Sequence, residues 1–264
     1  MIDVQSLSMR YGHFEALKDV SFQAREKEIL GLLGPNGAGK TTAMRILTTY
    51  LYPSSGTAKI DNYDILGNPA EVRKRTGYLP ETAPLYPDMR VDEYLRFVGE
   101  ARGLGGAALK GRMDWVKDAA GIGPIWKHTI SEISKGYRQR LGLAQALIHD
   151  PKVLILDEPT SGLDPLQIIG IRDLIKQLAE EKTIIFSTHI LQEVEAIADR
   201  IVIINEGKII AQGTQAELSE QVHAKGAAKQ DLSLEDIFIA LLMPKNAEGA
   251  RHLPRGRVPG TFGS

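Results

Sequence analysis

The stretch GPNGAGKTT, residues 34–42, decides the fold class of this 264-residue chain. It follows ILGLL, residues 29–33, a short apolar run typical of a strand buried on both faces, and a helix is expected to open at about Lys40. Glycines let backbone N–H groups turn inward around a phosphate, and the N-terminus of a helix adds partial positive charge. The strand–loop–helix context therefore predicts a P-loop, or Walker A motif, rather than a merely structural glycine turn.

Two residues of this loop have separate predicted roles. Lys40 reaches the β- and γ-phosphates of a nucleotide, and the hydroxyl of Thr41 ligates Mg²⁺. The nucleotide-binding residues predicted for the loop are Gly34, Pro35, Asn36, Gly37, Ala38, Gly39, Lys40, Thr41 and Thr42.

The composition fits one domain with elaborations, since 43% hydrophobic and 25% charged residues are ordinary for a soluble globular protein. The formal net charge of −1 gives no reason to expect a nucleic-acid partner. The absence of cysteine excludes disulfides, thiolate metal sites and thiol nucleophiles together. Because no basic–apolar leader opens the chain and no apolar run approaches the ~18 residues of a membrane span, membrane association is expected only through a partner.

Short β-branched runs recur at residues 153–156, 183–186 and 201–204. They predict an α/β fold, a P-loop NTPase core whose mostly parallel sheet is packed between helices. Alternating residues near the N-terminus, and again at 58–60, indicate an antiparallel β flank. From about residue 86 to 150 the strand pattern gives way to helical spacing, which predicts an inserted α-helical subdomain. We expect a nucleotide-binding domain over residues 1–220, a helical extension over 221–243 and a disordered tail over 244–264.

Further candidates for chemistry follow two of the predicted strands. Asp157 and Glu158 end the run at 153–156, at the edge where parallel sheets bind ligands. Asp157 would hold Mg²⁺ through water and Glu158 would polarise the attacking water, the alternative being a solvated pair of carboxylates. His189, after the run at 183–186, can reach the same edge and contact a γ-phosphate, although a lone histidine is more often structural.

These motifs, in this order from residue 2 to about 215, resemble the ATP-binding subunit of an ABC transporter. The resemblance implies that Tyr11 stacks on adenine and that Glu81, where the family usually has glutamine, contacts the metal and the attacking water. It also implies that the loop SGLD, residues 161–164, which ends at Asp164, lets the two sites of a dimer communicate.

The segment ISKGYRQR, residues 133–140, resembles the family's signature, which reads leucine, serine, glycine, glycine, glutamine. The resemblance implies that it opens a helix whose N-terminus binds the γ-phosphate of ATP held by the other subunit. Ser134 and Gly136 retain the groups that touch phosphate, and Lys135 adds positive charge if its backbone angles suit a residue with a Cβ. We interpret the segment as a working variant of the signature and not as an inactive one.

The substitutions at Glu81 and in ISKGYRQR are similar to those in ATP-binding proteins of ABC-2-type exporters. The resemblance implies ATP and Mg²⁺ as cofactors, a homodimer of cassettes in the ATP-bound state, and separately encoded integral membrane permease subunits. It places the protein in the cytoplasm, on the inner face of the cell membrane through the permease. A soluble ABC ATPase of translation or DNA repair is the main alternative and a P-loop kinase a remote one, while no residue predicts the cargo.

Overall fold

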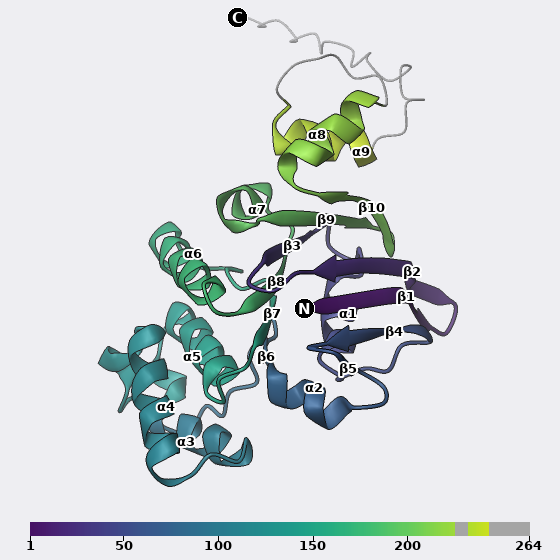
Figure 1. The fold of residues 1–264 in the computed structure, drawn as a ribbon. Helices are drawn as coiled ribbons and strands as arrows, with labels where there is room; N and C mark the ends of the chain where they lie inside the picture. Colours follow the sequence, from purple (N-terminus) through teal and green to yellow (C-terminus); the bar gives the residue numbers. More distant parts are fainter. Residues whose placement is uncertain (225–231, 243–264) are drawn as a thin grey trace, which may run out of the picture.

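The computed structural model describes residues 1–224 and 232–242, so the tail predicted for residues 244–264 lies outside the described part. An antiparallel sheet with the strand order β2-β1-β4-β5 forms one flank of the molecule (Figure 1). Its strands are β1 (Ile2–Tyr11), β2 (Phe14–Ala24), β4 (Ser55–Ile60) and β5 (Tyr63–Asp64). The predicted antiparallel flank is confirmed, and its pairing aligns Val4 with both Phe22 and Ala58.

The central sheet has the strand order β10-β9-β3-β8-β7-β6. Its strands are β3 (Ile29–Leu33), β6 (Thr76–Leu79), β7 (Val153–Asp157), β8 (Thr183–Thr188), β9 (Arg200–Asn205) and β10 (Lys208–Gly213). All neighbouring strands run parallel except the edge pair of β10 and β9. The mostly parallel sheet that the β-branched runs predicted is therefore confirmed.

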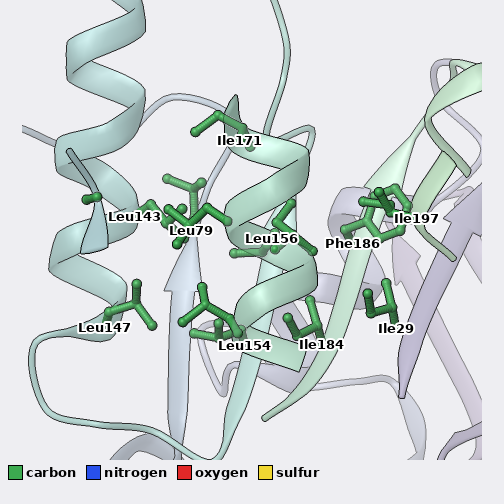
Figure 2. Close-up of a cluster of buried hydrophobic side chains, with 14 of the residues drawn as sticks. Ile29, Leu79, Leu143, Leu147, Leu154, Leu156, Ile171, Ile184, Phe186 and Ile197 are labelled. Carbon is green, nitrogen blue, oxygen red and sulfur yellow. The ribbon is translucent and has the colours of Figure 1, made fainter. Parts of the chain in front are cut away.

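Side chains that alternate along the central strands divide the core into two layers. On β7, Leu154 and Leu156 face one layer, whereas Val153 and Ile155 face the other. Figure 2 shows the first layer, where Leu154, Leu156 and Phe186 meet side chains from the helices that cover this face. Burial on both faces explains why these strands appear in the sequence as continuous apolar runs.

Helices cover the two faces of the central sheet unequally. α1 (Lys40–Leu47) lies between the central sheet and the antiparallel flank, while α6 (Pro165–Ala179) and α7 (Leu191–Ile197) cover the opposite face (Figure 1). The short helix α2 (Pro69–Arg75) precedes β6. In the described residues, α8 (Gln215–Ala224) and α9 (Leu234–Leu242) pack together next to β10. None of the helices within residues 1–224 and 232–242 is long and apolar enough to cross a bilayer.

The predicted helical insertion is confirmed and lies on the β6 side of the central sheet in Figure 1. It contains α3 (Val91–Ala101), α4 (Gly106–Ala119), two short 3₁₀ turns (Gly123–Ile125 and Ile130–Glu132) and α5 (Lys135–Leu147). α5 returns the chain to the central sheet, because it packs on β6 through residues such as Leu143 and Leu147 (Figure 2). The insertion thus spans residues 80–152, between the end of β6 and the start of β7.

Candidate nucleotide site

The strand order brings the predicted motifs to one edge of the central sheet. β8 lies between β3 and β7, with Leu33 paired to Thr188 and Asp157 paired to Ser187. The P-loop follows β3, His189 follows β8, and Glu158 follows β7. Because the three strands are parallel, all three segments leave the sheet at its carboxyl edge.

The backbone of the P-loop requires glycine at two positions. Gly39 has φ 107°, in the left-handed region, and a Cβ there would lie 2.5 Å from the carbonyl oxygen of Ala16. A Cβ at Gly34 would lie 2.2 Å from the carbonyl oxygen of Ile204. Helix α1 begins at Lys40 with no side-chain cap and no acidic residue in its first turn, so its N-terminal N–H groups remain available to an anion.

Lys40 is held in a buried ion pair with Glu158. Its Nζ lies 3.3 Å from Oε1 of Glu158, and the two side chains are 6% and 9% exposed. The ammonium also donates to the carbonyl oxygens of Gly34 at 2.8 Å and Pro35 at 3.2 Å. The lysine predicted to bind phosphate and the carboxylate predicted to activate water are therefore in direct contact, which no local motif could indicate.

Asp157 presents one satisfied and one unsatisfied carboxylate oxygen. Oδ1 accepts hydrogen bonds from Ser187 Oγ at 2.6 Å and Thr41 Oγ1 at 3.2 Å. Oδ2 is buried and has no hydrogen-bond partner within the described part of the chain. A buried oxygen of this kind beside a threonine hydroxyl is a donor set suited to a hard, oxygen-liganded cation.

The same carboxylate acts on Tyr78 of β6. Burial, together with the negative charge of Asp157, raises the pKa of the Tyr78 phenol to about 12. Tyr78 therefore stays neutral at physiological pH and adds no negative charge to this side of the site.

Glu158 occupies an uncommon backbone conformation, with φ 49°. Its N–H donates to the hydroxyl of Ser187 at 3.0 Å, and its Oε2 lies 3.0 Å from Nδ1 of His189. The Nδ1 side of His189 therefore faces Glu158, which leaves Nε2 for another partner. The strained backbone and the two side-chain contacts hold Glu158 in one orientation, as expected at a functional site.

A cavity of about 520 Å³ collects most of the predicted residues. Its lining is Tyr11, Phe14, Ala16, Asn36, Gly37, Gly39, Lys40, Thr41, Thr42, Glu81, Glu158, Ser161 and His189. Phe14, Ala16, Ser161 and the supporting Ser187 were not predicted as site residues. Phe14 pairs with Tyr11 across the hairpin turn formed by Gly12 and His13, and the spacing of two aromatic residues around a two-residue turn was a signal for it.

The signature-like segment is not part of this cavity. Ser134, Lys135 and Gly136 are absent from its lining in the described chain, and Gly136 instead lines a second cavity with Tyr137 and Arg140. The segment opens α5, as the resemblance implied, and Ser134 caps this helix by accepting from the N–H of Tyr137 at 3.3 Å. Lys135 is not among the described residues with positive φ, so its backbone tolerates a side chain.

The communicating loop lies against this segment within the same chain. A Cβ at Gly162 would lie 1.9 Å from Nζ of Lys135, so the lysine side chain covers the loop backbone. Asp164 itself caps α6 by accepting from the N–H of Gln167 at 2.9 Å and does not line the cavity. Ser161 is the residue of this loop that reaches the cavity.

This fold and this site define a P-loop NTPase with an inserted helical subdomain. The family model for ABC transporters matches residues 17–161. The ABC transporter ATP-binding protein NatA of Bacillus subtilis is 40% identical over 209 residues, which cover 78% of this chain and 85% of that protein. The chain therefore belongs to the ABC transporter family, and as an ATP-binding cassette it hydrolyses ATP to drive transport.

Other similar proteins agree with this assignment. A probable multidrug ABC transporter ATP-binding protein of Escherichia coli, YbhF, is 36% identical over 92% of this chain and 42% of its own length. A solved ATP-binding subunit of an ABC transporter superposes with a TM-score of 0.81 at 30% identity, covering 91% of this chain and 99% of that chain. A dimeric bacterial ABC transporter cassette superposes with a TM-score of 0.73 at 25% identity, covering 81% and 98%. These relatives give no support to the soluble alternative.

Proposed function

We propose that this chain powers an exporter of the ABC-2 type, in which two copies close head to tail over ATP beneath separate membrane subunits. The observation that supports ATP hydrolysis at this site is the shared cavity of Lys40, Glu158 and His189. The similarity to a multidrug-type protein supports export, and the similarity to a dimeric cassette supports closure as a pair. Under this proposal the protein is cytoplasmic and attaches to the inner face of the membrane through the permease.

The chain's own residues perform distinct tasks under this proposal. Tyr11 stacks on the adenine, and the backbone of residues 34–42 surrounds the phosphates. Lys40 exchanges its carbonyl and Glu158 contacts for the β- and γ-phosphates, which frees Glu158 to orient a water. His189, oriented by Glu158, directs Nε2 toward the γ-phosphate.

The residues at the carboxyl edge also fit Mg²⁺. Thr41 and Asp157 would hold the ion, and the unsatisfied Oδ2 of Asp157 supports this assignment. Glu81 lines the same cavity as Thr41. When bound, Mg²⁺ neutralises charge that develops on the phosphates. Glu81 is exposed and lies in the segment that leads from β6 into the helical subdomain.

Replacing Glu81 by glutamine should make nucleotide binding less dependent on Mg²⁺. A carboxylate adds negative charge beside the phosphates, so the metal compensates more in the native protein than in the variant. We expect the ratio of the ATP Kd in EDTA to the Kd in Mg²⁺ to fall by about threefold or more in Glu81→Gln. Glu100→Gln, at an exposed position on α3, is the control. Equal ratios in Glu81→Gln and the native protein would remove Glu81 from the metal site.

A disulfide across two chains tests the head-to-tail dimer. The side chain of Ala38 is only 2% exposed and packs in the core, so the exposed Asn36 is the better P-loop position for a cysteine. In a head-to-tail pair Asn36 of one chain faces Ser134 of the other across the triphosphate, and a disulfide requires Cα atoms within about 7 Å. We expect Asn36→Cys with Ser134→Cys, in a Glu158→Gln background that slows ATP loss, to give a covalent dimer on a non-reducing gel.

The chain has no natural cysteine, so any disulfide joins introduced residues, and Asn36→Cys and Ser134→Cys alone control for bonds between like positions. ATP should raise the yield of dimer, whereas Asn36→Cys paired with Gly111→Cys should give none, because Gly111 lies in open space on α4. A dimer yield that is the same with and without ATP, or a cross-link within one chain only, would contradict closure in trans. Co-purification of a multi-helix membrane protein with the native chain tests the permease separately.

A further inference from the structure

A buried carboxylate outside the nucleotide cavity connects two segments of the site. Glu193, in the first turn of α7, is 2% exposed. Its Oε1 accepts a hydrogen bond from the hydroxyl of Thr160, and its Oε2 accepts one from the hydroxyl of Thr188 at 2.6 Å. Both threonines are also buried, at 5% and 0% exposure.

The two threonines belong to different functional segments. Thr188 ends β8 directly before His189, and its hydroxyl also accepts from the N–H of Ile190 at 3.0 Å, so it holds both flanks of the histidine. Thr160 lies two residues after Glu158, and its carbonyl oxygen accepts from the N–H of Leu163 in the loop that reaches Asp164. One carboxylate therefore touches the histidine segment and the residue directly before the communicating loop.

Burial of the Glu193 carboxylate costs more free energy than a purely structural contact is expected to require. A carboxylate loses hydration on burial, and an opposite charge usually compensates. No ion pair of the described residues includes Glu193, so its partners are the two neutral hydroxyls and the N-terminal end of a short helix. Each hydroxyl in turn would be buried without an acceptor if the carboxylate were removed.

We propose that Glu193 is a positioning residue for ATP hydrolysis, which couples the segment of His189 to the loop of residues 158–164. Glu193 is not a residue of the cavity lining or of the P-loop. Its removal releases His189 from its place beside Glu158 and releases the loop that carries Ser161. This inference rests on the proposed site residues, and it concerns turnover and not nucleotide affinity.

We expect Glu193→Ala to lower kcat by a factor on the order of ten or more, because small displacements of positioned groups slow catalysis strongly. The ATP Kd should change less than kcat, since Glu193 reaches the P-loop only indirectly, through Thr188, whose carbonyl oxygen accepts from the N–H of Gly34 at 3.3 Å. Glu193→Gln should recover most of the rate, because an amide can accept from one hydroxyl and donate to the other. If the contact served only the fold, both variants would melt at a lower temperature, but kcat would not fall while the ATP Kd stayed nearly constant.

The decisive measurement is a double-mutant cycle on the two threonines. Thr160→Val and Thr188→Val each remove one hydroxyl at constant shape. If Glu193 couples them, their effects on kcat are non-additive by about threefold or more in the native chain and additive in the Glu193→Ala background. Thr183→Val, at the opposite end of β8, is the matched control, because it removes a buried, hydrogen-bonded hydroxyl and should lower stability without changing kcat.

Two outcomes would overturn the proposal. Additive effects of Thr160→Val and Thr188→Val in the native chain would show that Glu193 does not join the segments. A kcat per folded molecule equal to that of the native chain in Glu193→Ala would reduce Glu193 to a structural role. If Glu193→Ala fails to fold, the double-mutant cycle of Thr160→Val and Thr188→Val in the native chain still tests the proposal. Absence of ATPase activity in the native chain itself would instead count against the proposed site.

Discussion

Replacing Glu158 by glutamine should lower ATP turnover by a factor on the order of 10²–10⁴ while ATP still binds. The carboxylate lies beside His189 at the carboxyl edge of the sheet, where it can accept a proton from an attacking water. Glutamine has nearly the same shape but cannot act as a base. Phosphate release under single-turnover conditions, together with equilibrium binding of ATP, measures the two effects separately.

Glu206→Gln is a matched control for this variant. Glu206 also has a positive φ, 47°, but lies in the turn between β9 and β10, outside the cavity lining. Its turnover should equal that of the native protein. Turnover of Glu158→Gln within about threefold of native would remove Glu158 from the role of general base.

Lys40→Ala should weaken ATP binding by about 10²-fold or more, because under the proposed function the buried ammonium contacts the phosphates before and during the reaction. The structure adds a second effect, on stability without nucleotide. Removing Lys40 leaves the carboxylate of Glu158 buried without its cation, and breaking such a pair costs about 3–5 kcal/mol when both groups are deeply buried. The cavity beside the pair admits water, so we expect a loss at or below the lower end of this range.

The double variant Lys40→Ala, Glu158→Gln distinguishes the two effects. Neutralising Glu158 removes the unpaired charge, so the double variant should melt at a higher temperature than Lys40→Ala while ATP binding stays weak. Lys176→Ala, at an exposed position on α6, should change neither property. If the double variant melts below both single variants, the ion pair between Lys40 and Glu158 does not control the stability of the site.

Much of the site could be predicted because its motifs are contiguous in the chain. The glycines of residues 34–42 determine a backbone shape within nine residues, and Ser134 caps the helix that starts at the next residue. The burial of the strands on both faces is similarly local, since each run carries its own apolar pattern. These features depend on φ/ψ preferences and on neighbours a few residues away.

The P-loop, the acidic pair at Asp157 and Glu158, the antiparallel flank and the helical insertion could thus be predicted from local patterns. Which strand lies between β3 and β7, and so which side chains meet, follows from the folded chain alone. The contact of Lys40 with Glu158, the support of Asp157 by Ser187 and the hydrogen bond of Glu193 with Thr160 all join segments that lie far apart in the sequence. The pattern of one segment does not specify its neighbours, because the order of strands is set by the packing of the whole core.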